Sequence, residues 1–163
     1  MRLAAALLVG VALYTTPALA DPTDDEPESA RIDPDYAAGK KAIDAKDWTT
    51  AIRTLSSAAL RDTRNADIQN YLGFAYRNAG EMKQAFEHYE RALKLNPRHR
   101  GAHEYVGEAY LLVDNLPKAE EHVAALRAIC LIPCEELEDL QAKVSAYRKR
   151  ASNDGSSARP VLR

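Results

Sequence analysis

The sequence predicts an all-α fold, a helical-repeat solenoid of stacked hairpins. The main observation is a constant interval, which separates Gly39 from Gly73 and Gly73 from Gly107. A second column with the same period follows each glycine by 12 positions, at Ala51, Ala85 and Ala119. A fixed period of about 34 residues is typical of arrays of helical hairpins. Because one hairpin cannot bury its own apolar face, neighbouring units must cover one another.

Residues 1–20 are predicted to be a signal peptide. Arg2 gives a positive start, residues 3–13 are apolar, and residues 18–20 are the small-residue pattern Ala-Leu-Ala that precedes cleavage. We therefore expect a mature chain that begins at Asp21 and is periplasmic or secreted. No second apolar segment follows, so no stable membrane insertion is expected after cleavage.

Residues 21–31 are predicted to be an acidic, disordered linker, because five acids and two prolines occur between Asp21 and Glu28. Without Arg2, 21 of the 22 basic residues remain against 24 acidic ones, which gives a net charge of −3. This charge argues against a nucleic-acid partner.

Three repeat units are expected, at residues 32–65, 66–99 and 100–133. Turn-forming pairs at Ala79-Gly80, Asn96-Pro97 and Asp114-Asn115 separate the helices. The helices themselves are predicted near residues 34–45, 48–60, 66–78, 82–95, 100–113 and 116–130. Glycine inside a helix costs roughly 1 kcal/mol relative to alanine. Its recurrence indicates a close approach of two helices, and we expect the alanine column opposite the glycines.

A further helix is predicted within residues 134–150. Its apolar positions recur at helical spacing, at Leu137, Leu140, Val144 and Tyr147. The last unit of a solenoid needs such a cover, so we interpret this segment as a capping helix. A dimer seam is the alternative. Residues 151–163 are rich in Ser, Gly and Asn and are expected to be a disordered tail.

The middle unit resembles a tetratricopeptide repeat (TPR). Residues 66–99 read ADIQNYLGFAYRNAGEMKQAFEHYERALKLNPRH, and the matching positions are Leu72, Gly73, Tyr76, Ala85, Tyr89, Ala92 and Pro97. Gln69 stands where the family usually has tryptophan. The first and third units keep fewer of these positions. The resemblance implies three TPR hairpins followed by the capping helix, and a role in binding other proteins.

Cys130 and Cys134 are the only cysteines and lie between the last repeat helix and the capping helix. In an exported protein, two close cysteines usually form a disulfide, which here would orient the capping helix. The alternatives are a redox thiol pair or a soft-metal site. The segment CLIPCEELEDL also resembles the ends of small exported bacterial repeat proteins, a resemblance that names no function.

Motifs for catalysis or cofactor binding are weak, and we predict neither an enzyme nor a cofactor. His99 and His103 are four residues apart and could face one metal ion, but no third ligand is evident, so no metal site is predicted. His88 and His122 share a repeat position on the second helices, where we expect the outer face. Neither a phosphate-binding loop nor a nucleophile elbow occurs in the sequence.

In the TPR family, the first helices of the units line a concave groove that binds partners. Carried over by this resemblance, the candidate groove residues are Tyr36, Lys40, Asp44, Asn70, Phe74, Arg77, Asn78, Glu104 and Glu108. Tyr36, Phe74 and Arg77 are the residue types that dominate interfaces. Leu111 and Leu112 also occupy groove positions, but we expect them to pack against the capping helix. The basic positions of the family's two-carboxylate clamp fall on Gly101 and Tyr105, so a C-terminal chaperone tail is not expected as ligand.

The sequence thus favours an exported adaptor that binds a segment of another exported or periplasmic protein in the groove. The alternative is a thiol-based redox or metal-handling accessory protein that uses Cys130 and Cys134. An enzyme with an unrecognised site ranks third.

Overall fold

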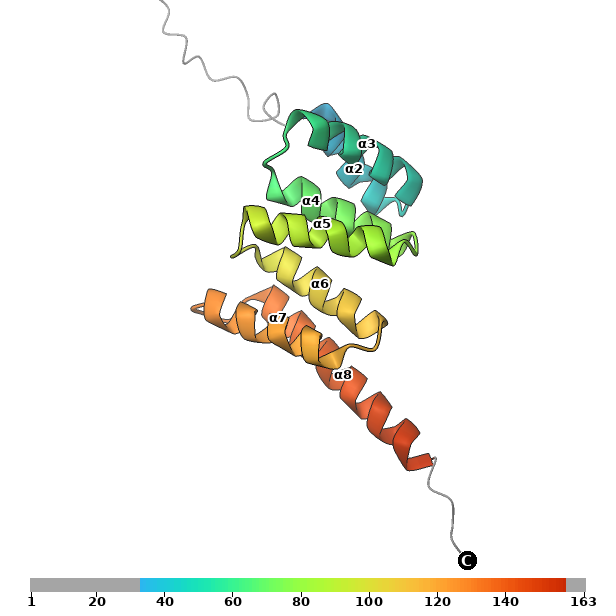
Figure 1. The fold of residues 1–163 in the computed structure, drawn as a ribbon, viewed down its shortest axis with the longest axis vertical. Helices are drawn as coiled ribbons and strands as arrows, with labels where there is room; N and C mark the ends of the chain where they lie inside the picture. The colour runs from blue at the N-terminus through green and yellow to red at the C-terminus, as the bar shows by residue number, and fades with distance from the viewer. Residues whose placement is uncertain (1–32, 158–163) are drawn as a thin grey trace, which may run out of the picture. The chain divides into compact units, whose positions relative to one another are not determined.

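The computed structural model describes residues 33–157, which form seven α-helices (Figure 1). They are α2 (Pro34–Asp44), α3 (Trp48–Arg61), α4 (Ala66–Asn78), α5 (Met82–Leu95), α6 (Arg100–Leu112), α7 (Leu116–Ile129) and α8 (Glu135–Ser157). The predicted all-α class of stacked hairpins is confirmed, and the six repeat helices agree with their predicted bounds to within one residue. The predicted signal peptide and acidic linker lie outside the described residues.

Each hairpin turns at the same repeat position. Lys46, Gly80 and Asp114 are each one repeat period apart, and all three have positive φ, at 56°, 84° and 55°. The next residue caps the second helix in two of the units, where the side chain of Asp47 accepts from Thr50 N at 3.0 Å and that of Asn115 accepts from Lys118 N at 3.2 Å. Only Gly80 adopts the left-handed conformation without a steric cost.

The repeated glycines lie at close helix contacts, but the residues opposite them differ from the prediction. A Cβ on Gly39 would lie 2.5 Å from Leu55 Cγ, and one on Gly73 would lie 2.5 Å from Tyr89 Cδ1. These partners follow the alanine column by four residues, one helical turn. In the third unit the equivalent residue is the smaller Val123, and Leu140 of α8 meets Gly107 instead, at 2.6 Å.

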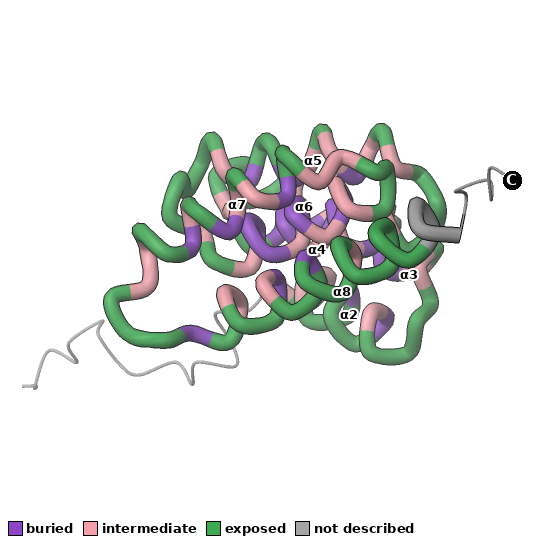
Figure 2. The backbone as a smooth tube through the Cα atoms, turned by 90° about the horizontal axis from the view of Figure 1, so that it is seen from below, coloured by how far each residue is buried: buried purple, intermediate pink, exposed green. Residues whose placement is uncertain are grey.

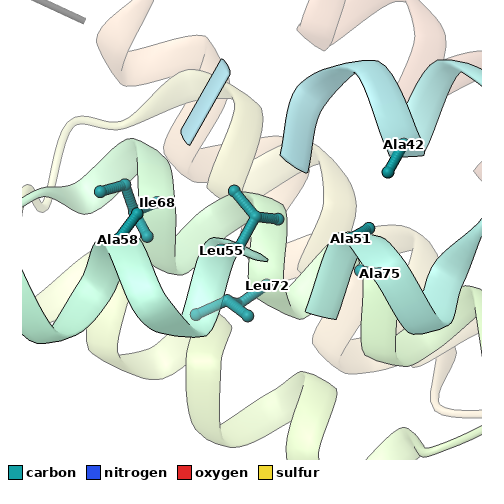
Figure 3. Packing of buried hydrophobic residues seen from close by; sticks show 7 residues of the cluster. All are labelled: Ala42, Ala51, Leu55, Ala58, Ile68, Leu72 and Ala75. Atoms are coloured by element: carbon teal, nitrogen blue, oxygen red, sulfur yellow. The ribbon is translucent and has the colours of Figure 1, made fainter. Parts of the chain in front are cut away.

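Buried residues gather where the helices face one another (Figure 2). Between the first hairpin and α4, the side chains of Leu55, Ile68 and Leu72 lie together among small alanines (Figure 3). A second cluster joins α5 to α6 through Tyr89 and Val106. Alanines let the helix backbones approach, while the larger side chains fill the space between units.

Helix α8 packs on α6 and α7, as expected of a capping helix. Its Leu140 and Val144 are buried in one cluster with Val123 and Leu126 of α7. The helix does not end near Arg150 but continues to Ser157, so the first residues of the predicted tail are helical. No proline interrupts this stretch before residue 160, and Ser152 Oγ donates to Lys149 O at 2.8 Å. Within residues 33–157, no helix is long and apolar enough to cross a membrane.

Candidate functional site

The first helices of the hairpins form one continuous face, which we call the inner face. Helix α2 contacts α4, α4 contacts α6, and α8 continues the row beside α6. This arrangement follows from the repeat, because every unit places its first helix in the same way. All nine predicted groove residues belong to these first helices, α2, α4 and α6.

Aromatic side chains form a row along the inner face. The ring of Phe74 lies 4.9 Å from that of Tyr105 and 6.1 Å from that of Trp48, measured between centroids. Tyr36 pairs with Tyr71 at 6.0 Å, and Lys40 Nζ lies over both of these rings. Such distances are typical of tilted and edge-on aromatic contacts. The row therefore offers rigid apolar surface with polar groups at its margins.

Four charged residues link α4, α6 and α8 beside this row. Arg77 Nη1 donates to Glu108 Oε2 at 2.6 Å and to Tyr105 O at 3.1 Å. Lys143 of α8 donates to the other Glu108 oxygen, and its Nζ lies 3.9 Å from Glu104 Oε1. The Arg77 side chain is only 8% exposed. Because its guanidinium donates to Glu108 and to the Tyr105 carbonyl, Arg77 contributes to the shape of the groove and is not free to pair with a ligand.

Glu104 is the most perturbed carboxyl group of this network. Its pKa is raised to about 7, first by burial and then by the nearby Glu108 carboxylate, while Lys143 opposes the shift. A carboxyl group with this pKa is partly protonated at neutral pH. Glu104 can therefore either donate or accept a hydrogen bond toward the groove.

Two clefts lie along α4, α6 and α8, one toward the N-terminal ends of these helices and one further along them. The first, which we call the polar cleft, has a volume of about 570 Å³ and is lined by residues from α4, α6 and α8 that include Asn70, Glu104 and Asp139. Asn70 is 4% exposed, and its Oδ1 atom has no hydrogen-bond partner among the described residues. The polar cleft thus presents hydrogen-bonding groups of both kinds.

The second, which we call the apolar cleft, has a volume of about 380 Å³. Its apolar lining is formed by Leu111, Leu112, Ala146 and Tyr147, and the polar and charged lining residues are Arg77, Asn78, Glu108, Lys143 and Arg150. We expected Leu111 and Leu112 to pack against the capping helix. Leu111 does so and is half-buried, but Leu112 is 64% exposed and opens to the cleft. The helical periodicity places the two neighbours on different sides of α6.

The structure distributes the predicted groove residues over three regions. Asn70 and Glu104 line the polar cleft, while Arg77, Asn78 and Glu108 line the apolar cleft. Phe74 lies between them in the aromatic row, and Tyr36 and Lys40 of α2 join this row at Tyr71. Asp44 is an exposed residue of α2 that belongs to none of the three regions.

The sequence reasoning missed several residues of this face. Tyr71 and Tyr105 are one repeat period apart and could have been found as a repeat column. Lys143 belongs to α8, outside the repeat, and no repeat rule places it.

The histidines form hydrogen bonds within the protein, and the positions of His88 and His122 differ from the predicted outer face. His88 Nδ1 bonds Gln69 Oε1 at 2.8 Å, and its ring stacks on Tyr76. One repeat later, His122 Nδ1 bonds His103 Nδ1 at 2.9 Å. His88 and His122 therefore face their own first helices rather than the outer surface, because the first helix supplies a buried polar partner at each level.

His99 and His103, the two histidines considered as metal ligands, form hydrogen bonds within the protein. His103 Nε2 bonds Pro97 O at 3.1 Å, and His99 Nδ1 accepts from Ala102 N at 3.2 Å to cap α6. Residues 33–157 contain no group of three side chains that could hold a metal ion.

A disulfide joins Cys130 and Cys134, with 6.1 Å between their Cα atoms. It closes the junction between α7 and α8, and Cys134 O accepts from Leu137 N and Glu138 N at the start of α8. Leu131 and Ile132, within the closed ring, are 94% and 78% exposed. Metal binding would require both thiols to be free, whereas a redox pair would cycle between this disulfide and the two thiols.

Comparison with known proteins identifies the repeat directly. Residues 66–99 match the tetratricopeptide repeat family model. The protein O-mannosyl-transferase Tmtc3 of Drosophila melanogaster is 31% identical over 88 residues, which cover 53% of this chain and 9% of that protein. The uncharacterized protein ycf37 of Pyropia yezoensis is 31% identical over 108 residues, which cover 59% of this chain and 60% of that protein. The chain thus spans less than two thirds of the length of either curated relative.

Solved structures share the fold. The Sgt2 TPR domain from Aspergillus fumigatus has a TM-score of 0.67 at 19% identity, over 84% of this chain and 87% of that one. PcrH in complex with the chaperone binding region of PopD has a TM-score of 0.66 at 19% identity, over 77% and 97% of the two chains. The second TPR domain of human RPAP3 in complex with an HSP70 peptide has a TM-score of 0.61 at 15% identity, over 68% and 92%. The fold is therefore that of stacked TPR-like hairpins.

Proposed function

We propose that this chain is an exported, non-enzymatic adaptor that binds an extended or helical segment of another exported protein along its inner face. The observation that carries the proposal is the aromatic row of Trp48, Phe74 and Tyr105, which runs between a polar and an apolar cleft. Aromatic residues in a concave surface are frequent anchors of protein interfaces. PcrH and RPAP3, which have the same fold, were each solved with a segment of another protein.

The two clefts indicate what such a segment would present. At the apolar cleft, an aliphatic side chain would cover Leu111 and Leu112. At the polar cleft, backbone amides or hydroxyl groups would satisfy Asn70 and the carboxyl group of Glu104. Because apolar burial supplies affinity and hydrogen bonds supply orientation, the segment would bind in one direction.

Export is part of the proposal and has its own test. The segment at residues 1–20 has the composition of a cleavable signal peptide. Protein recovered from outside the cytoplasm should begin at Asp21 when its N-terminus is sequenced. A chain that keeps Met1 and remains in the cytoplasm would exclude an exported role.

The binding proposal is tested by photo-crosslinking in living cells. A photoreactive amino acid replaces Asn78 or Asp139, which are exposed at the two clefts, or Lys83, which is exposed on the second helix α5. Both groove positions should crosslink to the same protein, and the Lys83 position should not. Crosslinks that form only at Lys83 would show that the outer face is the binding surface.

A further inference from the structure

The turn between the two cysteines presents apolar surface that the described part of the chain does not cover. We call Leu131 and Ile132 the apolar turn; they are 94% and 78% exposed. Isolated exposed leucines are ordinary, but these two are adjacent and held in a five-residue covalent ring between α7 and α8. A ring of this kind restricts the conformations of the free protein, so less entropy is lost when the two side chains are bound.

The apolar cleft is a suitable receptor for such side chains. Its volume of about 380 Å³ lies within the range of about 300–1,000 Å³ that is typical of pockets that take a ligand. Its floor is aliphatic at Leu111, Leu112 and Ala146, and Leu112 is 64% exposed.

Side chains without an ion pair carry opposite charges at the two surfaces. Glu135 and Glu138 follow the apolar turn in the first turn of α8, and both are exposed. At the rim of the apolar cleft, Arg150 lies over the Tyr147 ring at 5.3 Å. None of these three side chains forms an ion pair with another described residue. Opposite charges at matching borders favour one orientation of contact.

One molecule cannot bring its own two surfaces together. The apolar turn precedes Glu135, whereas the cleft uses Tyr147 and Arg150 further along the same helix. With a rise of about 1.5 Å per residue, Tyr147 lies roughly 18 Å along α8 from Glu135. The apolar turn can therefore enter an apolar cleft only on another copy of the chain.

We propose that the chain associates with itself head to tail, with the apolar turn of one copy entering the apolar cleft of the next. The contact is heterologous, so it extends into chains or closes into rings. It is also small, because few residues take part, and is therefore weak and dependent on concentration. This contact uses the same cleft as the proposed partner segment, so self-association and partner binding would compete there. The self-association test needs no partner, so it can fail or succeed separately from the adaptor proposal.

The test uses sedimentation velocity on the full chain, purified without reductant, from micromolar to the highest soluble concentration. The wild-type sedimentation coefficient should rise with concentration. Leu131→Ser with Ile132→Ser removes the apolar side chains of the turn, and Leu112→Glu places a charged side chain in the cleft. Either variant should remain monomeric with unchanged helicity, since all three side chains are exposed. Leu60→Ser is the matched control, because Leu60 is 83% exposed on α3 and should leave association unchanged.

Mixing the two variants distinguishes this contact from others. The turn variant still has a cleft and the cleft variant still has a turn, so an equimolar mixture should form heterodimers that stop at two chains. Monomeric wild type at every concentration would overturn the proposal. So would a mixture that remains monomeric, since that result would show that the turn does not enter the cleft, and so would association that Leu60→Ser abolishes. A cleft variant that still associates by itself would indicate a contact between two turns instead. Reduction of the disulfide should weaken association by about tenfold or more, because the turn loses its fixed conformation.

Discussion

The buried pair of His103 and His122 should make stability depend on pH between about 4 and 6.5. His103 Nε2 must donate to Pro97 O, so its Nδ1 accepts from His122 Nδ1, and both rings are neutral in this arrangement. The pKa of His122 is lowered to about 4, first by burial and then by the neighbouring His103. Burial also lowers the pKa of His103. Glu121, Lys118 and His99 are the other charged or titratable groups that act on the pair.

The sign and size of the effect follow from linkage. The unfolded chain binds protons near pH 6.5, whereas the folded chain does not until lower pH, so the contribution is fully present above pH 6.5 and is lost as the pH falls toward 4. One pKa unit corresponds to about 1.4 kcal/mol, so a fall from 6.5 to about 4 would correspond to about 3 kcal/mol. Because His122 is partly exposed, we expect a loss of about 2 kcal/mol.

The test substitution is His103→Gln, which introduces the residue that the second repeat has at the equivalent position, Gln69. There, at the equivalent positions one repeat earlier, Gln69 Oε1 already bonds His88 Nδ1 at 2.8 Å. The variant should keep the bond to His122 and remove one titrating ring. Its stability at pH 7.5 should stay within about 1 kcal/mol of wild type. Between pH 7.5 and 4.5 its free energy of unfolding should fall less than that of wild type, because one ring with a lowered pKa is gone.

The assay is urea unfolding followed by circular dichroism at several pH values. Glu104 contributes with the opposite sign, because its raised pKa makes the folded chain bind more protons between about pH 4.5 and 7. Both proteins contain Glu104, so its contribution cancels when their curves are subtracted. Parallel curves of unfolding free energy against pH would refute the reasoning about the histidine pair.

Three further predictions concern the hairpins and the disulfide. Gly73→Leu should destabilise the chain by at least about 1–3 kcal/mol in thermal unfolding, because even a Cβ would lie 2.5 Å from Tyr89; an unchanged melting temperature would contradict this contact. Lys46→Gly should stabilise it by about 1 kcal/mol because φ is 56° there, and a decrease in stability would show that the turn is not strained. Cys130→Ser with Cys134→Ser should cost about 2 kcal/mol or less and should speed amide exchange from Leu137 to Tyr147; two alkylated thiols in protein taken from the cell without reductant would instead favour redox or metal chemistry.

The fold could be predicted from the sequence because the same hairpin pattern recurs in three repeat units. Glycine, alanine and turn positions recur with one common period, and each column indicates the same hairpin. The end of α8 could not be predicted in this way, because no repeat or proline marks it before residue 160. The partner of Gly107 was also missed, since Val123 is too small to fill the place that Tyr89 fills in the middle unit.

The candidate site was less predictable because it depends on contacts between units. The family resemblance placed Arg77 in the groove, but only the structure shows its ion pair with Glu108 and the role of Lys143 from outside the repeat. The hydrogen-bonded pairs Gln69–His88 and His103–His122 could have been recognised in the sequence, because the two pairs have the same separation along the chain. The exposure of Leu131 and Ile132 could not be recognised in the sequence, because apolar residues next to a predicted helix are usually expected to be buried against it.

The central claim is that the inner face binds a partner segment, and an affinity comparison tests it most directly. Once crosslinking has identified the segment, its affinity is measured for wild type, for Asn78→Arg with Asp139→Arg, and for Lys83→Glu. All three altered residues are exposed, so the fold should be retained. The account predicts that the groove variant binds at least about tenfold more weakly, while Lys83→Glu binds as wild type does. Equal affinity of the groove variant and wild type would contradict the account.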